Sequence, residues 1–167
     1  MDTFNDVASD TYEASDKPFD FIPDGGRTAL ICEPDPSIRV KIMKALRKMD
    51  YHITKSASAQ DALREMRFHL YDVVVLNEYF DTEDPNANDV LEYLKYLPVN
   101  IRRNIYVALV SDRFRTMDNM ASLADSVNLV INKANIDDVD TIIKRGIADN
   151  KSFYLVFKES LRKTGRH

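Results

Sequence analysis

The sequence predicts an α/β domain: a doubly wound, five-stranded parallel sheet covered by helices on both faces, with an extra helix at the C-terminus. Short apolar runs alternate with stretches of helical periodicity five times along the chain, which is typical of strands joined by helical crossovers. The most apolar run, residues 73–76, ends abruptly at Asn77 and is followed by a polar loop. Such a run indicates a buried central strand whose carboxyl end faces a crevice.

Each element follows from a local pattern. The apolar or alternating runs predict strands at residues 28–32, 51–57, 72–77, 104–110 and 127–132. The intervening segments predict helices at residues 36–49, 59–70, 88–97, 116–125 and 136–150. Right-handed crossovers then place these helices on both faces of the sheet.

Three helices have start signals in the sequence. Asp35 precedes Pro36, so the acid is expected to cap the first helix with proline at the first helical position. Ser58, with Asp61 three residues later, resembles a capping box. The same spacing between Asn135 and Asp138 predicts that Asn135 caps the last helix.

Charge divides the chain into an acidic leader, residues 1–27, a central domain, residues 28–149, and a basic amphipathic helical extension, residues 150–167. Residues 1–24 carry seven acids and one base, whereas the extension carries five bases and one acid. An acidic segment with few aliphatic residues is expected to be flexible. A weaker hypothesis is that the leader lies against the basic extension of its own or a neighbouring chain.

The composition is typical of a globular protein in the cytoplasm, since 44% of residues are hydrophobic and 30% are charged. No apolar run approaches the ~18 residues that cross a bilayer, and we expect neither a secretory signal nor membrane binding. Cys32, the single cysteine, suits a reducing compartment and is expected to be an inert core residue.

Five segments in order resemble the landmarks of the bacterial response-regulator receiver domain: "LICEPDPSIR", "YHITKSASAQDAL", "YDVVVLN", "VALVS" and "LVINKAN". The resemblance covers about residues 28–149. It implies the CheY-like, flavodoxin-like strand order 2-1-3-4-5, with a crevice at the carboxyl ends of strands 1, 3 and 5. It also implies a role in two-component signal transduction or a phosphorelay.

The resemblance implies a phospho-acceptor pocket, and several of its positions are altered here. The acidic pair that binds Mg²⁺ in the family matches Glu33 and Pro34, and the phospho-acceptor aspartate matches Asn77. Proline offers no metal ligand, and an uncharged amide oxygen is a poor nucleophile. The phosphoryl-binding positions are retained as Ser111 and Lys133. The aromatic that moves on activation in the family is replaced by Val130.

We therefore predict a phosphorylation-independent pseudo-receiver without a metal, cofactor or enzymatic activity. Glu33 and Lys133 are expected to pair across Asn77, which would satisfy the pocket and lock it. Simple drift of an unused pocket predicts the same loss of phosphorylation. Two alternatives stay open: a switch that responds to a small ligand in the crevice, and a receiver phosphorylated on a substitute acid such as Asp81 or Asp84.

Function is then expected to lie on the surface, in binding to a protein partner or a second copy rather than to nucleic acid. In receivers, the fourth helix, fifth strand and fifth helix commonly form the partner face. The loop Arg113–Phe114–Arg115 places an aromatic between two bases at that face, as in many interface anchors. Phe153, Phe157 and Leu161 repeat every four residues in the extension, which indicates an amphipathic helix with a second candidate surface.

Overall fold

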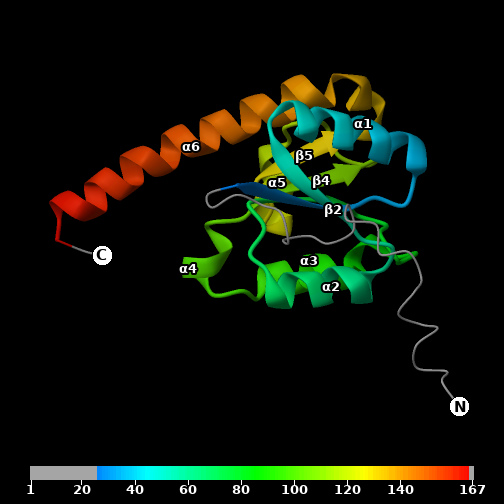
Figure 1. The fold of residues 1–167 in the computed structure, drawn as a ribbon, viewed down its shortest axis with the longest axis horizontal. Coiled ribbons are helices and arrows are strands. Elements are labelled where there is room, and N and C mark those ends of the chain that lie inside the picture. Colours follow the sequence, from blue (N-terminus) through cyan, green and yellow to red (C-terminus); the bar gives the residue numbers. More distant parts are fainter. Residues whose placement is uncertain (1–25, 166–167) are drawn as a thin grey trace, which may run out of the picture.

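A computed structural model describes residues 26–165 of the chain, and the acidic leader lies almost entirely outside these residues. The centre of the domain is a parallel sheet of five strands in the order β2-β1-β3-β4-β5 (Figure 1). This confirms the predicted fold and strand order. The strands are β1 Arg27–Cys32, β2 Tyr51–Lys55, β3 Val73–Asn77, β4 Tyr106–Ser111 and β5 Leu129–Asn132.

Helices cover both faces of the sheet, as predicted. The α-helices are α1 Pro36–Lys48, α2 Ala59–Phe68, α3 Asp89–Lys95, α4 Val99–Arg102, α5 Asn119–Asp125 and α6 Val139–Lys163. Two 3₁₀ turns, η2 Pro85–Ala87 and η3 Lys133–Asp138, precede α3 and α6. The single-turn helix α4 was not predicted from the sequence. Within residues 26–165, no helix is both long and apolar enough to cross a bilayer.

The sheet separates two hydrophobic cores because successive residues of a strand point to opposite faces. On one face, Ala29 and Ile31 of β1 pack with the apolar sides of α1 and α6. On the other face, Leu30 and Cys32 pack with α2, α3 and α5. Figure 1 shows α1 and α6 on one side of the sheet and α2 and α3 on the other. Every residue of β3 is buried, as expected of a central parallel strand.

The helix start signals were correct at two of the three positions. The Asp35 carboxylate accepts from the backbone N–H of Ser37, and the Ser58 hydroxyl accepts from that of Asp61. The predicted cap of the last helix was wrong. Asn135 lies inside η3, where its side-chain oxygen accepts from the Thr116 hydroxyl at 2.7 Å, and α6 begins only at Val139. The side chain of Asn135 therefore fastens η3 to the loop before α5 and does not cap a helix.

The last helix continues without a break from the domain into the C-terminal extension. Its buried residues, Val139, Ile143 and Ile147, all lie in the first half. After Ile147, no described residue of α6 is buried, and Figure 1 shows this half extending past the edge of the sheet. The predicted extension is thus helical, and residue 150 lies near the point where packing on the sheet ends.

Gly146 allows α6 to lie close to the sheet. A β-carbon at this position would collide with the hydroxyl of Tyr106 on β4 and would lie 3.3 Å from Leu129 Cδ2. Tyr106 is itself buried, so it has little room to move. A glycine inside a helix usually lowers stability by ~1 kcal/mol relative to alanine. Here the close packing reverses that preference.

We expect Gly146→Ala to lower the free energy of unfolding by about 1–3 kcal/mol, because overpacking outweighs the gain in helix propensity. Chemical denaturation of the full chain measures this difference. The double variant Gly146→Ala/Tyr106→Phe removes the clashing hydroxyl and should recover most of the loss. An alanine variant at least as stable as the native chain would contradict the close packing.

Candidate functional site at the carboxyl ends of the strands

The structure gathers the predicted pocket residues at one edge of the sheet. Parallel register pairs Cys32 with Leu76 and Asn77 with Val110 in neighbouring strands. The residues that end or follow these strands therefore meet: Glu33, Asn77, Ser111 and Lys133. Glu33, Asn77 and Ser111 are all buried.

Asn77 binds the buried carboxylate of Glu33 directly. Its side-chain nitrogen donates to both carboxylate oxygens, at 3.1 Å and 2.9 Å. The backbone N–H of Asp35 donates to one of the same oxygens at 3.1 Å. Glu33 is only 1% exposed, so these bonds replace the water that the carboxylate loses on folding. An aspartate at position 77 would offer no such donor.

The predicted ion pair between Glu33 and Lys133 is absent among the described residues. Among residues 26–165, the side chain of Lys133 forms no hydrogen bond or ion pair, although its charge favours the ionised form of Glu33. Burial raises the pKa of Glu33 above its ordinary value, and the bonds from Asn77 and Asp35 oppose this rise. The amide of Asn77 thus performs the role that we had assigned to Lys133.

Local bonds also hold the remaining polar groups of Asn77. Its side-chain oxygen accepts from the backbone N–H of Tyr79 at 2.8 Å. The backbone carbonyls of Asn77 and Glu78 accept from the side-chain nitrogen of Asn88, at 3.2 Å and 3.0 Å. Asn88 is buried and also caps α3 through Leu91. The start of the long loop between β3 and α3 (residues 78–88) and the start of α3 are therefore fastened together.

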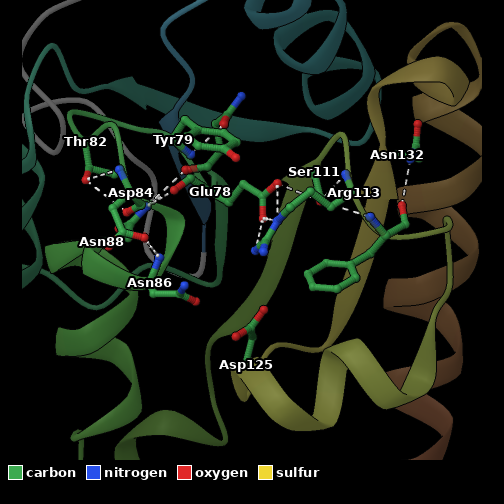
Figure 2. A network of polar contacts seen from close by, with 12 residues as sticks. Glu78, Tyr79, Thr82, Asp84, Asn86, Asn88, Ser111, Arg113, Asp125 and Asn132 are labelled. Carbon is green, nitrogen blue, oxygen red and sulfur yellow. Dashed lines mark hydrogen bonds and ion pairs between the residues drawn. The ribbon is translucent and has the colours of Figure 1, made fainter.

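Glu78 is the main residue of this site that the sequence analysis missed. Its carboxylate is 1% exposed and accepts from the Ser111 hydroxyl at 2.8 Å. Arg113 forms an ion pair with it at 2.8 Å and donates a further bond through Nε at 3.2 Å. Figure 2 shows Glu78 reaching from the end of β3 to both residues. Ser111, the serine expected to bind a phosphoryl oxygen, is thus bound by a carboxylate of the same chain.

A signal for Glu78 was present in the sequence. An acid directly after a fully apolar strand is unusual, because charged residues are rarely buried unless they are paired. Pairing Glu78 with Arg113, 35 residues later, required the register of β3 and β4. That register is a tertiary property, so the sequence alone indicated the acid but not its partners.

The other acids near the site have structural roles. Asp35 caps α1. The Asp81 carboxylate accepts from the N–H of Ala59 at 2.9 Å, at the start of α2. Asp84 caps η2, and the polar contacts of this loop are visible in Figure 2. Asp81 also has a positive φ of 53°, a conformation that glycine often takes in loops.

These side chains do not fit the Mg²⁺ site that the family resemblance implies. Mg²⁺ prefers several oxygen ligands in octahedral geometry. Both oxygens of Glu33 already accept hydrogen bonds, the Asn77 oxygen accepts from Tyr79, and Pro34 has no side-chain oxygen. A cation would have to displace these internal donors.

The structure separates the predicted surface residues into two groups. Phe114 is partly buried against the core and Arg113 lies over its ring while bound to Glu78, so neither is a freely exposed anchor. Arg115 is exposed. Val130, which was matched to the moving aromatic of the family and not to the surface, is fully buried. In the extension, Phe153 and Phe157 are exposed and Leu161 is partly exposed.

Solved structures with the same fold include several receiver domains. The receiver domain of the Francisella response regulator 1452 is 19% identical, with a TM-score of 0.59, and the match covers 76% of this chain and 98% of that one. Chemotaxis response regulator CheY4 of Vibrio cholerae is 14% identical, with a TM-score of 0.56 and coverage of 72% and 98%. At these identities the similarity shows the fold alone.

A third similar structure is the signal receiver domain of a signal transduction histidine kinase from Syntrophus aciditrophicus. It is 19% identical, with a TM-score of 0.57, and the match covers 74% of this chain and 91% of that one. No protein-family model matches the sequence, and no curated protein does so. The CheY-like fold is therefore established from structure rather than from sequence.

The raised pKa of Glu33 predicts a specific pH dependence. An acid whose pKa is higher in the folded chain favours folding at low pH, and this contribution is lost as the pH rises through the folded-state pKa. As the pH rises from below 4.5, the ordinary pKa of glutamate, through the raised pKa of Glu33, the free energy of unfolding of the native chain should fall relative to that of Glu33→Gln. Urea denaturation across a pH series measures this difference.

Subtracting the free energy of unfolding of Glu33→Gln from that of the native chain removes the effects of the other carboxylates, which both chains share. Glu33→Gln keeps an oxygen that can accept from Asn77, so the variant is expected to fold. Parallel stability curves for the two chains would contradict a raised pKa at Glu33.

Proposed function

We propose that this chain is a receiver-type signalling module that works without phosphorylation, through protein–protein interaction in bacterial signal transduction. The similarity to receiver domains supports the type of module. One observation carries the rest of the proposal: the residues at the phospho-acceptor position are bound to one another. Asn77 binds Glu33, while Glu78 binds Ser111 and Arg113.

Phosphoryl transfer to this pocket faces two chemical obstacles. An amide oxygen carries no negative charge and cannot form a stable acyl phosphate, so Asn77 cannot replace an aspartate nucleophile. Ser111 would have to leave Glu78 to bind a phosphoryl oxygen, and the buried Glu78 would then face an incoming anion. A like charge beside a buried carboxylate is strongly unfavourable.

The bonding pattern favours a locked pocket over simple drift. A pocket that had merely lost its role would leave some buried polar groups unpaired, at a cost of about 1–3 kcal/mol each. Instead, Glu33, Asn77, Glu78 and Ser111 all have partners in the structure. The arrangement supports a single stable conformation of the crevice.

Partner binding then falls to exposed apolar surface outside the crevice. Met120 and Leu123 on α5 are 74% and 75% exposed, on the helix that corresponds to the usual partner face of receivers. Phe153 and Val156 on α6 are similarly exposed, at 65% and 64%. Exposed apolar groups of this size are typical of interaction sites when they lie close together.

Incubation with acetyl phosphate and Mg²⁺ should leave the native chain unmodified, as read by intact mass. An intact receiver domain serves as the positive control. Asn77→Asp should also stay unmodified, because Pro34 supplies no metal ligand and Glu78 still holds Ser111. That variant should be less stable than the native chain by about 1–3 kcal/mol, since two buried carboxylates would face each other.

A stable phosphoryl adduct on the native chain would contradict the proposal. Glu78→Gln and Asp81→Asn would then show whether a substitute acid had been modified. Mg²⁺ binding to the native chain at millimolar concentration or below, measured by calorimetry, would contradict it independently.

The interaction role predicts that surface changes, rather than pocket changes, abolish partner capture. Proteins captured from the source cell by the native chain should also be captured by Asn77→Ala. They should be lost with Met120→Ser/Leu123→Ser or with Phe153→Ser/Val156→Ser, because each pair removes exposed apolar contacts. Loss of capture with Asn77→Ala and full capture by both surface variants would refute this role.

A further inference from the structure

The outer half of α6 presents apolar side chains that its own domain leaves uncovered. Phe153, Leu155 and Val156 point in different directions around the helix, and each is more than half exposed. Tyr154 contacts both Phe153 and Phe157 edge to face, with ring centres 5.5 Å and 6.1 Å apart. A helix that is apolar on several sides is normally covered by another segment.

Two neighbouring grooves run along this helix. The outer groove, of about 670 Å³, lies between α6 and the residues after α4, and Arg103, Tyr154, Phe157 and Lys158 help to line it. The inner groove, of about 490 Å³, lies between α6 and α1. Lys151 lines both grooves, which places them end to end along α6.

The inner groove begins where the N-terminal segment joins the sheet. Arg27, the first residue of β1, is part of its wall together with Lys48 and Lys144. The N-terminal segment is therefore joined to the domain at the wall of this groove. A segment of 24 residues can span on the order of 80 Å when extended, whereas the half of α6 beyond Lys151 is only about 20 Å long.

The charges along the two grooves favour an acidic occupant. Bases outnumber acids in their walls: Arg27, Lys48, Lys144, Lys151, Arg103 and Lys158 against Asp50 and Asp140. A second copy of this helix would bring like charges together, which disfavours self-association. Residues 1–24 carry seven acids, one base and the aromatic residues Phe4, Tyr12, Phe19 and Phe21. This segment matches both the charge and the apolar surface of the grooves.

We propose that residues 1–24 bind in these grooves of the same chain, with their acids beside the bases of α6 and their aromatic side chains against Tyr154 and Phe157. The segment would cover the exposed apolar part of α6 and compete with any partner that binds there. This proposal does not depend on whether the crevice can be phosphorylated.

Paramagnetic relaxation enhancement in the full chain tests this docking. A nitroxide label is attached to Ser15→Cys, within the acidic segment. Cys32 is fully buried and burial raises the pKa of its thiol, so the native cysteine should not react. Amide signals of residues 150–161 should be attenuated by the label, and signals from the exposed end of α2, near Phe68, should not.

Charge reversal separates specific docking from general attraction. Lys151→Glu/Lys158→Glu should abolish the attenuation, because both bases line the outer groove. Lys44→Glu/Lys55→Glu makes the same change in net charge at exposed positions outside these two grooves, and the attenuation should persist in this variant. Raising the salt concentration from ~0.05 M to ~0.5 M should weaken the attenuation in the native chain, since exposed charges are screened over shorter distances.

Three results would overturn the proposal. The first is unattenuated signals for residues 150–161 in the labelled chain. The second is attenuation that persists in Lys151→Glu/Lys158→Glu, which would show that charge does not direct the docking. The third comes from mixing two samples: nitroxide-labelled chains without ¹⁵N, and ¹⁵N-labelled chains without nitroxide. Attenuation as strong in this mixture as in the chain that carries both labels would identify a second copy as the source of the segment.

Discussion

The burial of two carboxylates at one edge of the sheet constrains the rest of the site. Glu33 and Glu78 follow the ends of β1 and β3, and each is almost fully removed from water. An unpaired buried charge costs several kcal/mol, so each must be satisfied from within the chain. Asn77 supplies an amide to Glu33, and Ser111 with Arg113 supplies donors to Glu78. These bonds use the groups that a phosphoryl pocket would need to leave available.

The same bonds connect the site to its supporting elements. Asn88 ties the backbone after β3 to the start of α3, and Asp81 ties the long loop to the start of α2. Side-chain hydrogen bonds to the backbone therefore fix the loop against α2 and α3 at the carboxyl edge of the sheet. These contacts support the proposal that the crevice has one resting conformation and that partners recognise the outer surface.

The last helix, α6, belongs to the packed domain in its first half and to the exposed surface in its second half. Its first half is packed on β4 and β5 through Ile143 and Ile147, and Gly146 permits the close approach to Tyr106. Its second half continues with the same helical geometry but has no sheet beneath it. Lys151, at the start of this half, lines the same groove as Arg27, the first residue of β1, and the exposed apolar residues follow beyond it.

The sequence by itself determined the alternation of elements, the parallel sheet, the caps by Asp35 and Ser58, and the presence of an amide at position 77, because these depend on local pattern or on single residue types. Only the tertiary structure decided the partners of the buried charges. Glu33 binds Asn77 rather than Lys133, Glu78 binds Arg113, and Asn135 binds Thr116 instead of capping a helix. These pairings join residues far apart in the chain, and strand register and loop packing, which local patterns do not encode, bring them together.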